Sequence, residues 1–265
     1  MHHYFGYGSN MNQVSLAAKG VRPLRSVPGS VPGWELCFDV HHWFRHEGGV
    51  GNIRPSDDSE AIVRGVLHLI EDVHLERLDA VESYGVGYDR IEVPVHTADG
   101  VVSAITYVGL PDYIDRSCRP TQRYLNILVA GAQQAGIDPA YIERIANHPI
   151  HEPGPSVRFE APVGEWPEYL STALPPAHTA LAGHVFDMSR CRPKHECLVA
   201  LLGGVDTTLF HLRRMDTSTA DESIEAVLAD RLREDQRAYL HAYLNEYARE
   251  YRYAGVCRYP STTES

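Results

Sequence analysis

Apolar and polar residues alternate in several short stretches of the first half of the chain, and this period of two is typical of half-buried β-strands. The clearest stretch is Trp34–Val40, in which every second residue is apolar. The aromatic residues of Tyr4–Tyr7 predict a first strand, and the β-branched residues of Ala61–Ile70 predict a strand near the centre of a sheet. Met11–Lys19 is expected to form a short helix, whereas Arg22–Pro32 is rich in Pro, Gly and Ser and predicts a loop.

A hairpin and three helices are expected between residues 72 and 148. The strands Tyr88–Thr97 and Val101–Leu110 are joined through Ala98-Asp99-Gly100, in which the Asp-Gly pair favours a tight β-turn. The helices are marked by apolar residues at helical spacing and by capping residues at their ends. The first helix is expected to begin with Asp72 as its N-cap. The second is expected to be capped by Thr121, to extend through Gln134 and to be closed by Gly136, and the third to run from Asp138 to about His148.

The last part of the chain differs in composition. Residues 151–176 contain Pro and Gly clusters with little periodicity and predict a linker. Helices are expected over Lys194–Leu202 and from Ser223 to about Tyr253. We therefore expect a domain over residues 1–150, a linker over 151–176, and a mainly helical extension over 177–265 whose role the sequence does not reveal.

Four tyrosines at a spacing of four residues predict an aromatic stripe along the last helix. The stripe consists of Tyr239, Tyr243, Tyr247 and Tyr251. Such a stripe usually packs against the rest of the protein or against a second copy of the chain, and only occasionally forms a ligand wall. A homodimer is therefore one expectation.

Charge and composition narrow the class of protein. The formal net charge of −11 argues against nucleic acid or an anionic membrane surface as a partner. No run of eighteen apolar residues suggests a membrane span, and no hydrophobic signal region follows Met1, so a cytoplasmic protein is expected. The five cysteines are scattered and odd in number, which favours reduced thiols. Lys19 and Lys194 are the only lysines in a chain rich in arginine, which we interpret as a composition bias without functional meaning.

Candidate chemistry begins near the N-terminus, in Tyr7-Gly8-Ser9-Asn10. Glycine lets the backbone approach a ligand closely, and Ser9 and Asn10 add short hydrogen-bonding side chains beside free backbone N–H groups. The segment therefore predicts a polar pocket at the end of the first strand. An ordinary strand followed by a turn is the alternative.

Glu82 is the second candidate. It lies seven residues after Leu75 and four after Leu78, so at helical period it falls on the same inward face. A carboxylate held out of water is suited to proton transfer. A glutamate in the last turn that turns outward to solvent is an equal alternative on the residues alone.

Three motifs in this order resemble the γ-glutamylcyclotransferase family. They are Tyr7-Gly8-Ser9-Asn10, then Glu82 before the turn Gly85-Val86-Gly87-Tyr88, and then Pro120–Tyr124 followed by Gly131 and Gly136. The resemblance covers roughly the first 150 residues. It implies an α/β fold in which a small mixed sheet curls into a barrel flanked by helices.

The resemblance also implies a reaction and a site. The family converts a γ-glutamyl amide into 5-oxoproline and a free amine by attack of the substrate's own α-amine, and needs no cofactor. Glu82 matches the family's catalytic glutamate, and the Tyr7–Asn10 turn matches the segment that cradles the glutamyl group. Residues 48–53 would line the pocket floor, and Tyr124 would offer a hydroxyl; for Tyr88 and Tyr107, core packing is an equal alternative. The Tyr-Gly-Ser-Asn form points away from glutathione and towards a biosynthetic amine with γ-glutamyl as a removable protecting group.

Other functions fit less well. Ser9 lacks the Gly-x-Ser-x-Gly setting of a nucleophile elbow, and Gly6-Tyr7-Gly8 lacks the Lys-Ser/Thr that follows in a P-loop. A binding module without turnover, or a hydrolase that releases glutamate, remains open as an alternative. The histidines of His41–Glu47, and the group Cys191, His195 and Cys197, fit no standard zinc ligand set, so no metal site is expected.

Overall fold

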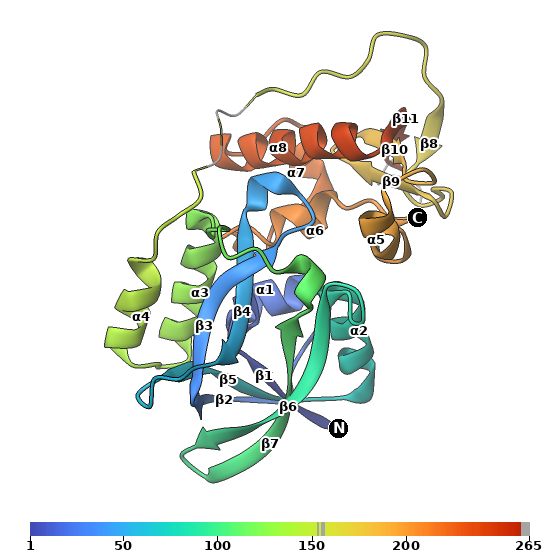
Figure 1. The fold of residues 1–265 in the computed structure, drawn as a ribbon. Helices are drawn as coiled ribbons and strands as arrows, with labels where there is room; N and C mark the ends of the chain where they lie inside the picture. Colours follow the sequence, from blue (N-terminus) through green and yellow to red (C-terminus); the bar gives the residue numbers. More distant parts are fainter. Residues whose placement is uncertain (153, 155–156, 261–265) are drawn as a thin grey trace. The chain divides into compact units, whose positions relative to one another are not determined.

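The structure, a computed structural model, describes residues 1–152, 154 and 157–260 (Figure 1). The chain divides into two compact units, Met1–Pro153 and Gly154–Ser265. The predicted linker, residues 151–176, lies partly outside the described residues, and its described part contains a short strand. None of the helices in the described ranges combines the length and apolarity that a membrane span requires.

The first unit is built on a closed barrel of five strands, which confirms the fold implied by the motifs. Around the barrel the strands follow the order β1 (His2–Gly6), β5 (Ile62–Ile70), β2 (Arg25–Pro32), β6 (Tyr88–Thr97) and β7 (Gly100–Gly109). The barrel closes where β1 runs parallel to β7, through Tyr4 and Ile105, and the other pairs are antiparallel. The predicted Asp-Gly hairpin joins β6 to β7, and β5 lies between two neighbours as expected.

The β2 strand corrects one expectation, because its residues were predicted to form a loop. It pairs with β5 in an unbroken register from Arg25–Leu69 to Pro32–Ile62. Its other edge meets β6 only through Ser30 and His96. A strand that needs hydrogen bonds along one edge only can accommodate proline, which has no amide hydrogen to donate.

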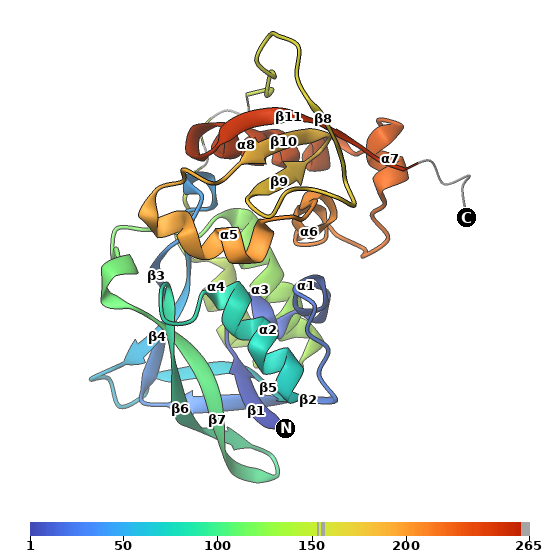
Figure 2. The same ribbon diagram turned by 90° about the vertical axis from the view of Figure 1, so that its right-hand side faces the viewer.

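A two-stranded ribbon and several helices accompany the barrel (Figures 1 and 2). β3 (Trp34–His41) and β4 (Gly49–Pro55) form an antiparallel ribbon with an irregularity between Cys37 and Val40. The helices are α1 (Gln13–Ala18), α2 (Asp72–Glu82), α3 (Gln122–Gln134) and α4 (Pro139–Ala146), with short 3-10 turns η1 (Ser9–Met11), η2 (Arg45–Glu47) and η3 (Pro111–Tyr113). The cap of α2 is Glu71, so the predicted Asp72 cap was wrong by one residue, whereas Thr121 and Asp138 cap α3 and α4 as predicted.

Two apolar clusters fix the end of β1. Phe5 is fully buried inside the barrel, and Met11, just after the strand, packs with Leu125 and Leu128 of α3. Gly131 permits this close approach of α3, because a Cβ there would lie 2.5 Å from the Asn12 amide nitrogen. The turn after β1 is therefore held between the barrel and α3.

The second unit combines helices with a four-stranded sheet, whereas a mainly helical extension was expected. The sheet order is β8 (Glu168–Leu170), β11 (Arg252–Arg258), β10 (His184–Asp187) and β9 (His178–Leu181). The helices are η4 (Pro193–His195), α5 (Glu196–Leu202), α6 (Thr208–Leu212), α7 (Ile224–Leu228) and α8 (Glu234–Glu250).

The long helix expected from Ser223 to Tyr253 is interrupted. α7 ends before Asp230, which has a φ of 50°, and α8 starts afresh after Arg233, whose backbone amide donates to Gln236 Oε1 at 3.1 Å. After α8 the chain turns into β11 instead of extending the helix. Short helices separated by a cap share the apolar periodicity of one long helix, so the break was not visible in that pattern.

The tyrosine stripe of α8 forms part of the core of its own unit. Tyr247 is fully buried, with its ring 5.6 Å from that of Phe186 on β10, and its hydroxyl lies 2.9 Å from His211 Nε2. The Tyr251 hydroxyl lies 3.0 Å from His195 Nδ1. The stripe therefore packs against the rest of the protein, which was one of the two expected roles.

Candidate active site

The turn after β1 and the end of α2 meet at one point, where the side chain of Asn10 contacts Glu82. The Asn10 amide Nδ2 donates to Glu82 Oε1 at 3.0 Å and to the Tyr4 hydroxyl at 2.5 Å. Asn10 is only 5% exposed. Residues 72 positions apart in the sequence are thus joined by a direct hydrogen bond.

Glu82 is the last residue of α2, and its side chain is 17% exposed. The helix stops because Ser83 adopts a left-handed conformation, with a φ of 52°. Leu78, one turn earlier on the same face, is fully buried. Of the two alternatives drawn from the sequence, the inward one is therefore observed: the carboxylate faces the turn instead of bulk water.

Lys19 is a member of this group that sequence reasoning missed. Its ammonium Nζ donates to Asn10 Oδ1 at 2.5 Å and to Ser9 Oγ at 3.1 Å, and lies 3.5 Å from Glu82 Oε1. Its side chain is 5% exposed. The interpretation of the lysines as composition bias without functional meaning therefore overlooked its position, and its rarity among so many arginines was the available signal.

Three tyrosines converge on the backbone of Gly51 in β4. The Gly51 amide donates to the Tyr124 hydroxyl at 3.0 Å, and the Tyr88 hydroxyl donates to the Gly51 carbonyl at 2.8 Å. The Tyr7 hydroxyl donates to the Tyr107 carbonyl at 2.6 Å and lies 3.5 Å from the Gly51 carbonyl. A Cβ on Gly51 would lie 2.9 Å from the Tyr124 hydroxyl, so only glycine fits. The Gly-rich strand thus contributes backbone at this point.

Burial keeps these hydroxyls protonated. It raises the pKa of Tyr124 to about 12, although the amides of Gly51 and Ser9 hydrogen-bond to its oxygen and oppose the rise. Burial also raises the pKa values of Tyr7 and Tyr88 well above the usual range. All three are hydrogen-bond donors at neutral pH. Tyr7 and Tyr88 donate to backbone carbonyls, whereas Tyr124 accepts from the Gly51 amide, and no acceptor for its own proton is found among the described residues.

His68 and Asp79 hold the residues of the site through hydrogen bonds, and neither was identified from the sequence. His68 on β5 is fully buried, with Nε2 3.0 Å from the Asn10 carbonyl oxygen and Nδ1 2.8 Å from Ser26 Oγ. Burial lowers its pKa to about 4, so the imidazole is neutral at pH 7. On α2, Asp79 accepts from the Tyr107 hydroxyl at 2.7 Å. These contacts fix the turn and the last turn of α2.

The catalytic and substrate-binding residues predicted from the sequence all lie in this part of the structure. Glu82 contacts Asn10 directly, and Ser9 is linked to both through Lys19. A Cβ on Gly8 would lie 2.9 Å from the Tyr124 hydroxyl. Tyr7, Tyr88 and Tyr124 meet around Gly51.

One group of side chains in the described residues has the geometry to share a metal ion. The ligand atoms of His41, Asp115 and Cys118 all lie within 4.8 Å of one another. Imidazole, carboxylate and thiolate ligands suit zinc. The group contains none of the site residues predicted from the sequence. Only His41 belongs to the histidine-rich segment His41–Glu47, because Asp115 and Cys118 follow β7.

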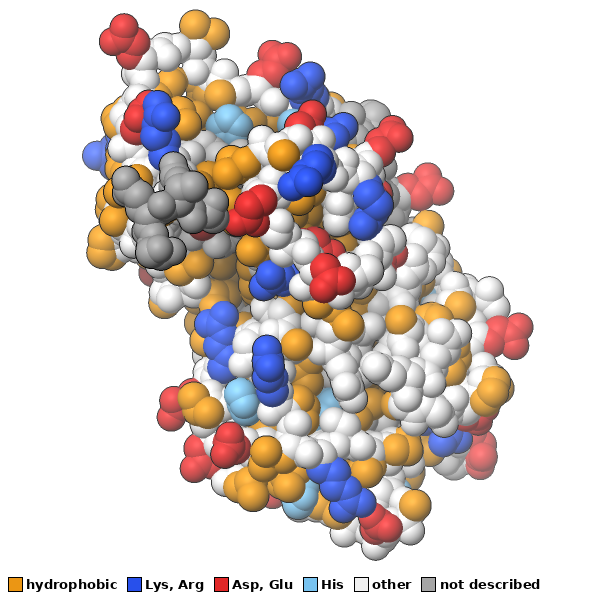
Figure 3. All heavy atoms as spheres, turned by 180° about the vertical axis from the view of Figure 1, so that it is seen from behind, with side chains coloured by type: hydrophobic (Ala, Val, Ile, Leu, Met, Phe, Trp, Pro, Cys, Tyr) orange, Lys and Arg blue, Asp and Glu red, His pale blue; other side chains and the backbone are white. Residues whose placement is uncertain are grey.

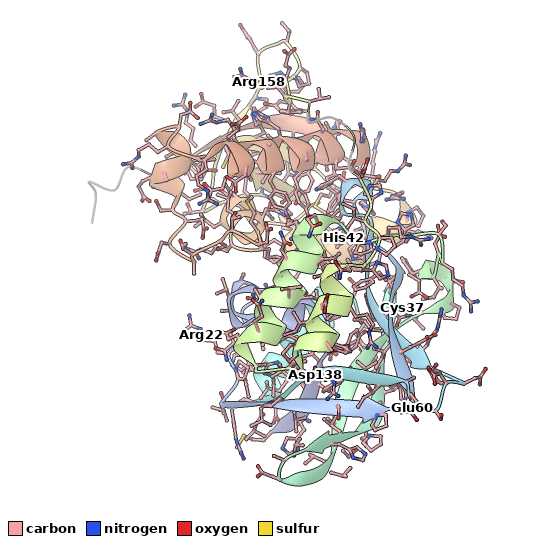
Figure 4. All side chains as sticks on the ribbon, turned by 90° about the vertical axis from the view of Figure 1, so that its left-hand side faces the viewer. Arg22, Cys37, His42, Glu60, Asp138 and Arg158 are labelled. Atoms are coloured by element: carbon pink, nitrogen blue, oxygen red, sulfur yellow. The ribbon has the colours of Figure 1, made fainter. Side chains whose placement is uncertain are left out.

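A cavity on the barrel and the charge distribution on one face complete the description of the surface. A cavity of about 280 Å³ lies on the barrel, lined by Arg64, His96 and Asp138 among others, with Asp138 at the start of α4 (Figure 4). On the face shown in Figure 3, basic side chains are interspersed with acidic and uncharged ones.

Comparison with known proteins shows which sequences the first unit resembles. The sequence model described as the AIG2-like family matches residues 62–145, which include Glu82, Tyr88 and Tyr124. Gamma-glutamyl cyclotransferase gliK of Claviceps purpurea is 29% identical over 186 residues, covering 65% of this chain and 83% of that protein. Gamma-glutamyl cyclotransferase aclK of Aspergillus oryzae is 27% identical over 178 residues, covering 59% of this chain and 64% of that protein.

Solved structures share the fold. A gamma-glutamyl cyclotransferase superposes with a TM-score of 0.51 at 22% identity, covering 59% of this chain and 92% of that chain. An uncharacterized human protein gives a TM-score of 0.50 at 22% identity, covering 62% of this chain and 94% of that chain.

The N-terminal part of the chain therefore resembles the γ-glutamylcyclotransferase-like family in sequence and in fold. Within that family it is similar to curated enzymes, and the chain is an enzyme of the γ-glutamylcyclotransferase type.

Proposed function

We propose that the enzyme cleaves a γ-glutamyl amide intramolecularly: the α-amine of the glutamyl group attacks its own γ-carbonyl, and 5-oxoproline and a free amine are released. The observation that carries the proposal is the contact between Glu82 and Asn10, which seats a carboxylate beside the turn Tyr7–Asn10. An inward carboxylate on this turn serves a reaction that moves protons, and mere binding does not require it.

The first contribution of the site is to hold a folded substrate. Nucleophile and electrophile belong to one molecule, so binding the conformer in which the amine approaches the carbonyl removes most of the entropic barrier. The turn Tyr7–Asn10 would hold the glutamyl group, with Ser9 and Asn10 beside it. The side chains of Tyr7, Tyr88 and Tyr124, which are buried, would enclose this end of the site.

The second contribution is proton transfer through Glu82. As the α-nitrogen forms a bond to the γ-carbon, Glu82 takes a proton from that nitrogen. It then returns a proton to the leaving nitrogen as the carbon–nitrogen bond of the amide breaks. One carboxylate serves both steps because the two nitrogens are attached to the same carbon in the intermediate.

The third contribution is stabilisation of the developing oxyanion. The Tyr124 hydroxyl accepts the Gly51 amide at 3.0 Å, so its own proton is directed away from the backbone. We assign this proton to the oxygen of the γ-carbonyl, together with backbone amides of the turn. Because burial keeps the pKa of Tyr124 at about 12, the hydroxyl donates throughout the neutral range.

The proposal also covers the substrate, the cellular location and the assembly of the enzyme. The substrate would be a biosynthetic amine that carries γ-glutamyl as a removable protecting group, and the reaction would take place in the cytoplasm without a cofactor. We propose a function independent of nucleic acid for this acidic chain, and association into a homodimer as its assembly. The division into a catalytic domain over residues 1–150 and a helical extension over 177–265 belongs to this picture.

A screen of γ-glutamyl amines tests the function. Purified enzyme is incubated with each amide, with and without a chelator, and 5-oxoproline and glutamate are measured by mass spectrometry. We expect 5-oxoproline, unaffected by the chelator, and a loss of about 10²–10⁴-fold in turnover for Glu82→Gln. Glutamate as the product would identify a hydrolase instead, and full activity of Glu82→Gln would remove Glu82 from the mechanism.

A further inference from the structure

Lys19 places a buried cation beside the proposed proton shuttle. It follows α1, and its ammonium nitrogen lies 3.5 Å from Glu82 Oε1 with a side chain only 5% exposed. Arg77 of α2 donates through Nε to the Lys19 carbonyl oxygen at 2.8 Å, which ties the end of α1 to the helix that carries Glu82. A buried ammonium is unfavourable unless it is paired, so packing alone does not explain its position.

The contacts of Lys19 determine which way the Asn10 amide points. An ammonium has three donors and no acceptor, so at 2.5 Å it can face only the carbonyl oxygen of that amide. The NH₂ group of Asn10 is then turned towards Glu82 Oε1 and the Tyr4 hydroxyl. With the amide reversed, Lys19 would face a second donor, and Glu82 would face an acceptor. Lys19 thus selects one of the two amide orientations.

The same contacts distinguish the two carboxylate oxygens of Glu82. Both Asn10 and Lys19 approach Oε1. Among the described residues, no hydrogen bond is recorded to Oε2. An oxygen that already accepts two donors is a poorer base than one that accepts none. The geometry leaves Oε2 as the oxygen that exchanges protons with the substrate.

We propose that Lys19 is a positioning residue of the reaction: it orients Asn10 and Glu82 Oε1 and makes the local electrostatics favour a deprotonated site. The proposal rests on the proposed function. It concerns a residue outside the three sequence motifs, and it assigns no direct contact between Lys19 and the substrate.

The electrostatic part addresses a difficulty in the chemistry. The α-amine of a γ-glutamyl compound arrives as an ammonium, which cannot attack the carbonyl. A fixed positive charge beside the site disfavours a second one, so it promotes loss of the proton from the incoming ammonium. This effect extends activity towards lower pH, and it disappears if Lys19 loses its charge.

The test measures kcat, KM and pH profiles of 5-oxoproline release for the wild-type enzyme, Lys19→Met, Lys19→Arg and Glu82→Gln. Arg22→Met is the control, because Arg22 is an exposed cation three residues away. Folding is checked by circular dichroism and thermal melts. We expect Lys19→Met to lower kcat by about 10²-fold with a much smaller change in KM, because reacting groups are misplaced. We also expect the acidic limb of its profile to move up by about one pH unit or more.

The outcomes separate the two proposals. A wild-type enzyme that releases no 5-oxoproline overturns the proposed function and the role of Lys19 with it. An inactive Glu82→Gln beside a Lys19→Met with wild-type kcat and pH profile overturns the role of Lys19 alone. Lys19→Arg keeps the charge and should retain the wild-type acidic limb. If Lys19→Met does not fold, Lys19→Arg carries the test, since an arginine variant whose limb also moves up by one pH unit overturns the role of the charge.

Discussion

Removal of the Tyr124 hydroxyl separates the catalytic contribution of the tyrosine cluster from its structural one. In Tyr124→Phe the ring keeps its edge-on contact with Phe38, whose centroid lies 6.1 Å away. The Gly51 amide loses its acceptor at 3.0 Å in a buried setting, which we expect to destabilise the unit by about 1–3 kcal/mol. If the hydroxyl also donates to the oxyanion, kcat should fall by about 10²–10³-fold, which corresponds to about 2.7–4 kcal/mol in the transition state.

Tyr88→Phe provides the contrast, because the Tyr88 hydroxyl donates to the Gly51 carbonyl at 2.8 Å. Its loss should lower stability by about 0.5–1.5 kcal/mol and leave kcat within a few-fold of the wild type. Tyr141→Phe, which removes a buried hydroxyl from α4, controls for the general effect of such a change.

The assay for these variants is kcat and KM for 5-oxoproline release, with urea denaturation for stability. A Tyr124→Phe enzyme with wild-type kcat, or a Tyr88→Phe enzyme that loses as much turnover as Tyr124→Phe, would refute the assignment of the oxyanion donor. Loss of stability without loss of kcat in both variants would place the whole cluster in the core.

Two further predictions concern stability. Burial lowers the pKa of His68 to about 4, so between about pH 6.5 and 4 the unfolded chain binds the His68 proton more readily than the native protein does. The free energy of unfolding should therefore fall by about 3 kcal/mol as the pH falls through that window. In His68→Gln, the urea midpoint should depend less on pH over the same range. In Gly51→Ala the new Cβ would lie 2.9 Å from the Tyr124 hydroxyl, so we expect a loss of about 1–3 kcal/mol together with reduced turnover; an unchanged melting temperature would contradict this packing.

Local patterns in the sequence were sufficient for much of the first unit. The Asp-Gly hairpin and the caps Thr121 and Asp138 depend on neighbours within one or two turns, and each is observed. Helical spacing left the inward and outward orientations of Glu82 as equal alternatives, and the structure shows the inward one. β2 was missed because its Pro and Gly residues also signal turns, and only its pairing with β5 makes it a strand.

The supporting residues of the site could not be inferred in the same way. Lys19 meets Glu82 across 63 positions, and His68 meets Asn10 across 58. Neither residue belongs to a periodic pattern or a motif, so its role is set by tertiary packing. The sheet of the second unit was missed for a related reason: β9 and β10 have only four residues each, too few for alternation to stand out.

The closure of the barrel couples folding to the chemistry. β1 is held by five residue pairs to β5, but its parallel contact with β7 is the single pair Tyr4–Ile105, which spans most of the unit. Contacts between such distant segments form late, after the entropy of a long loop has been lost. The turn that carries Asn10 is the direct continuation of β1. In a folding intermediate whose first strand is not yet docked, Glu82 would therefore be present on α2 without its hydrogen-bond partner Asn10. During refolding, the return of turnover should therefore lag behind the return of helical signal and coincide with docking of the first strand.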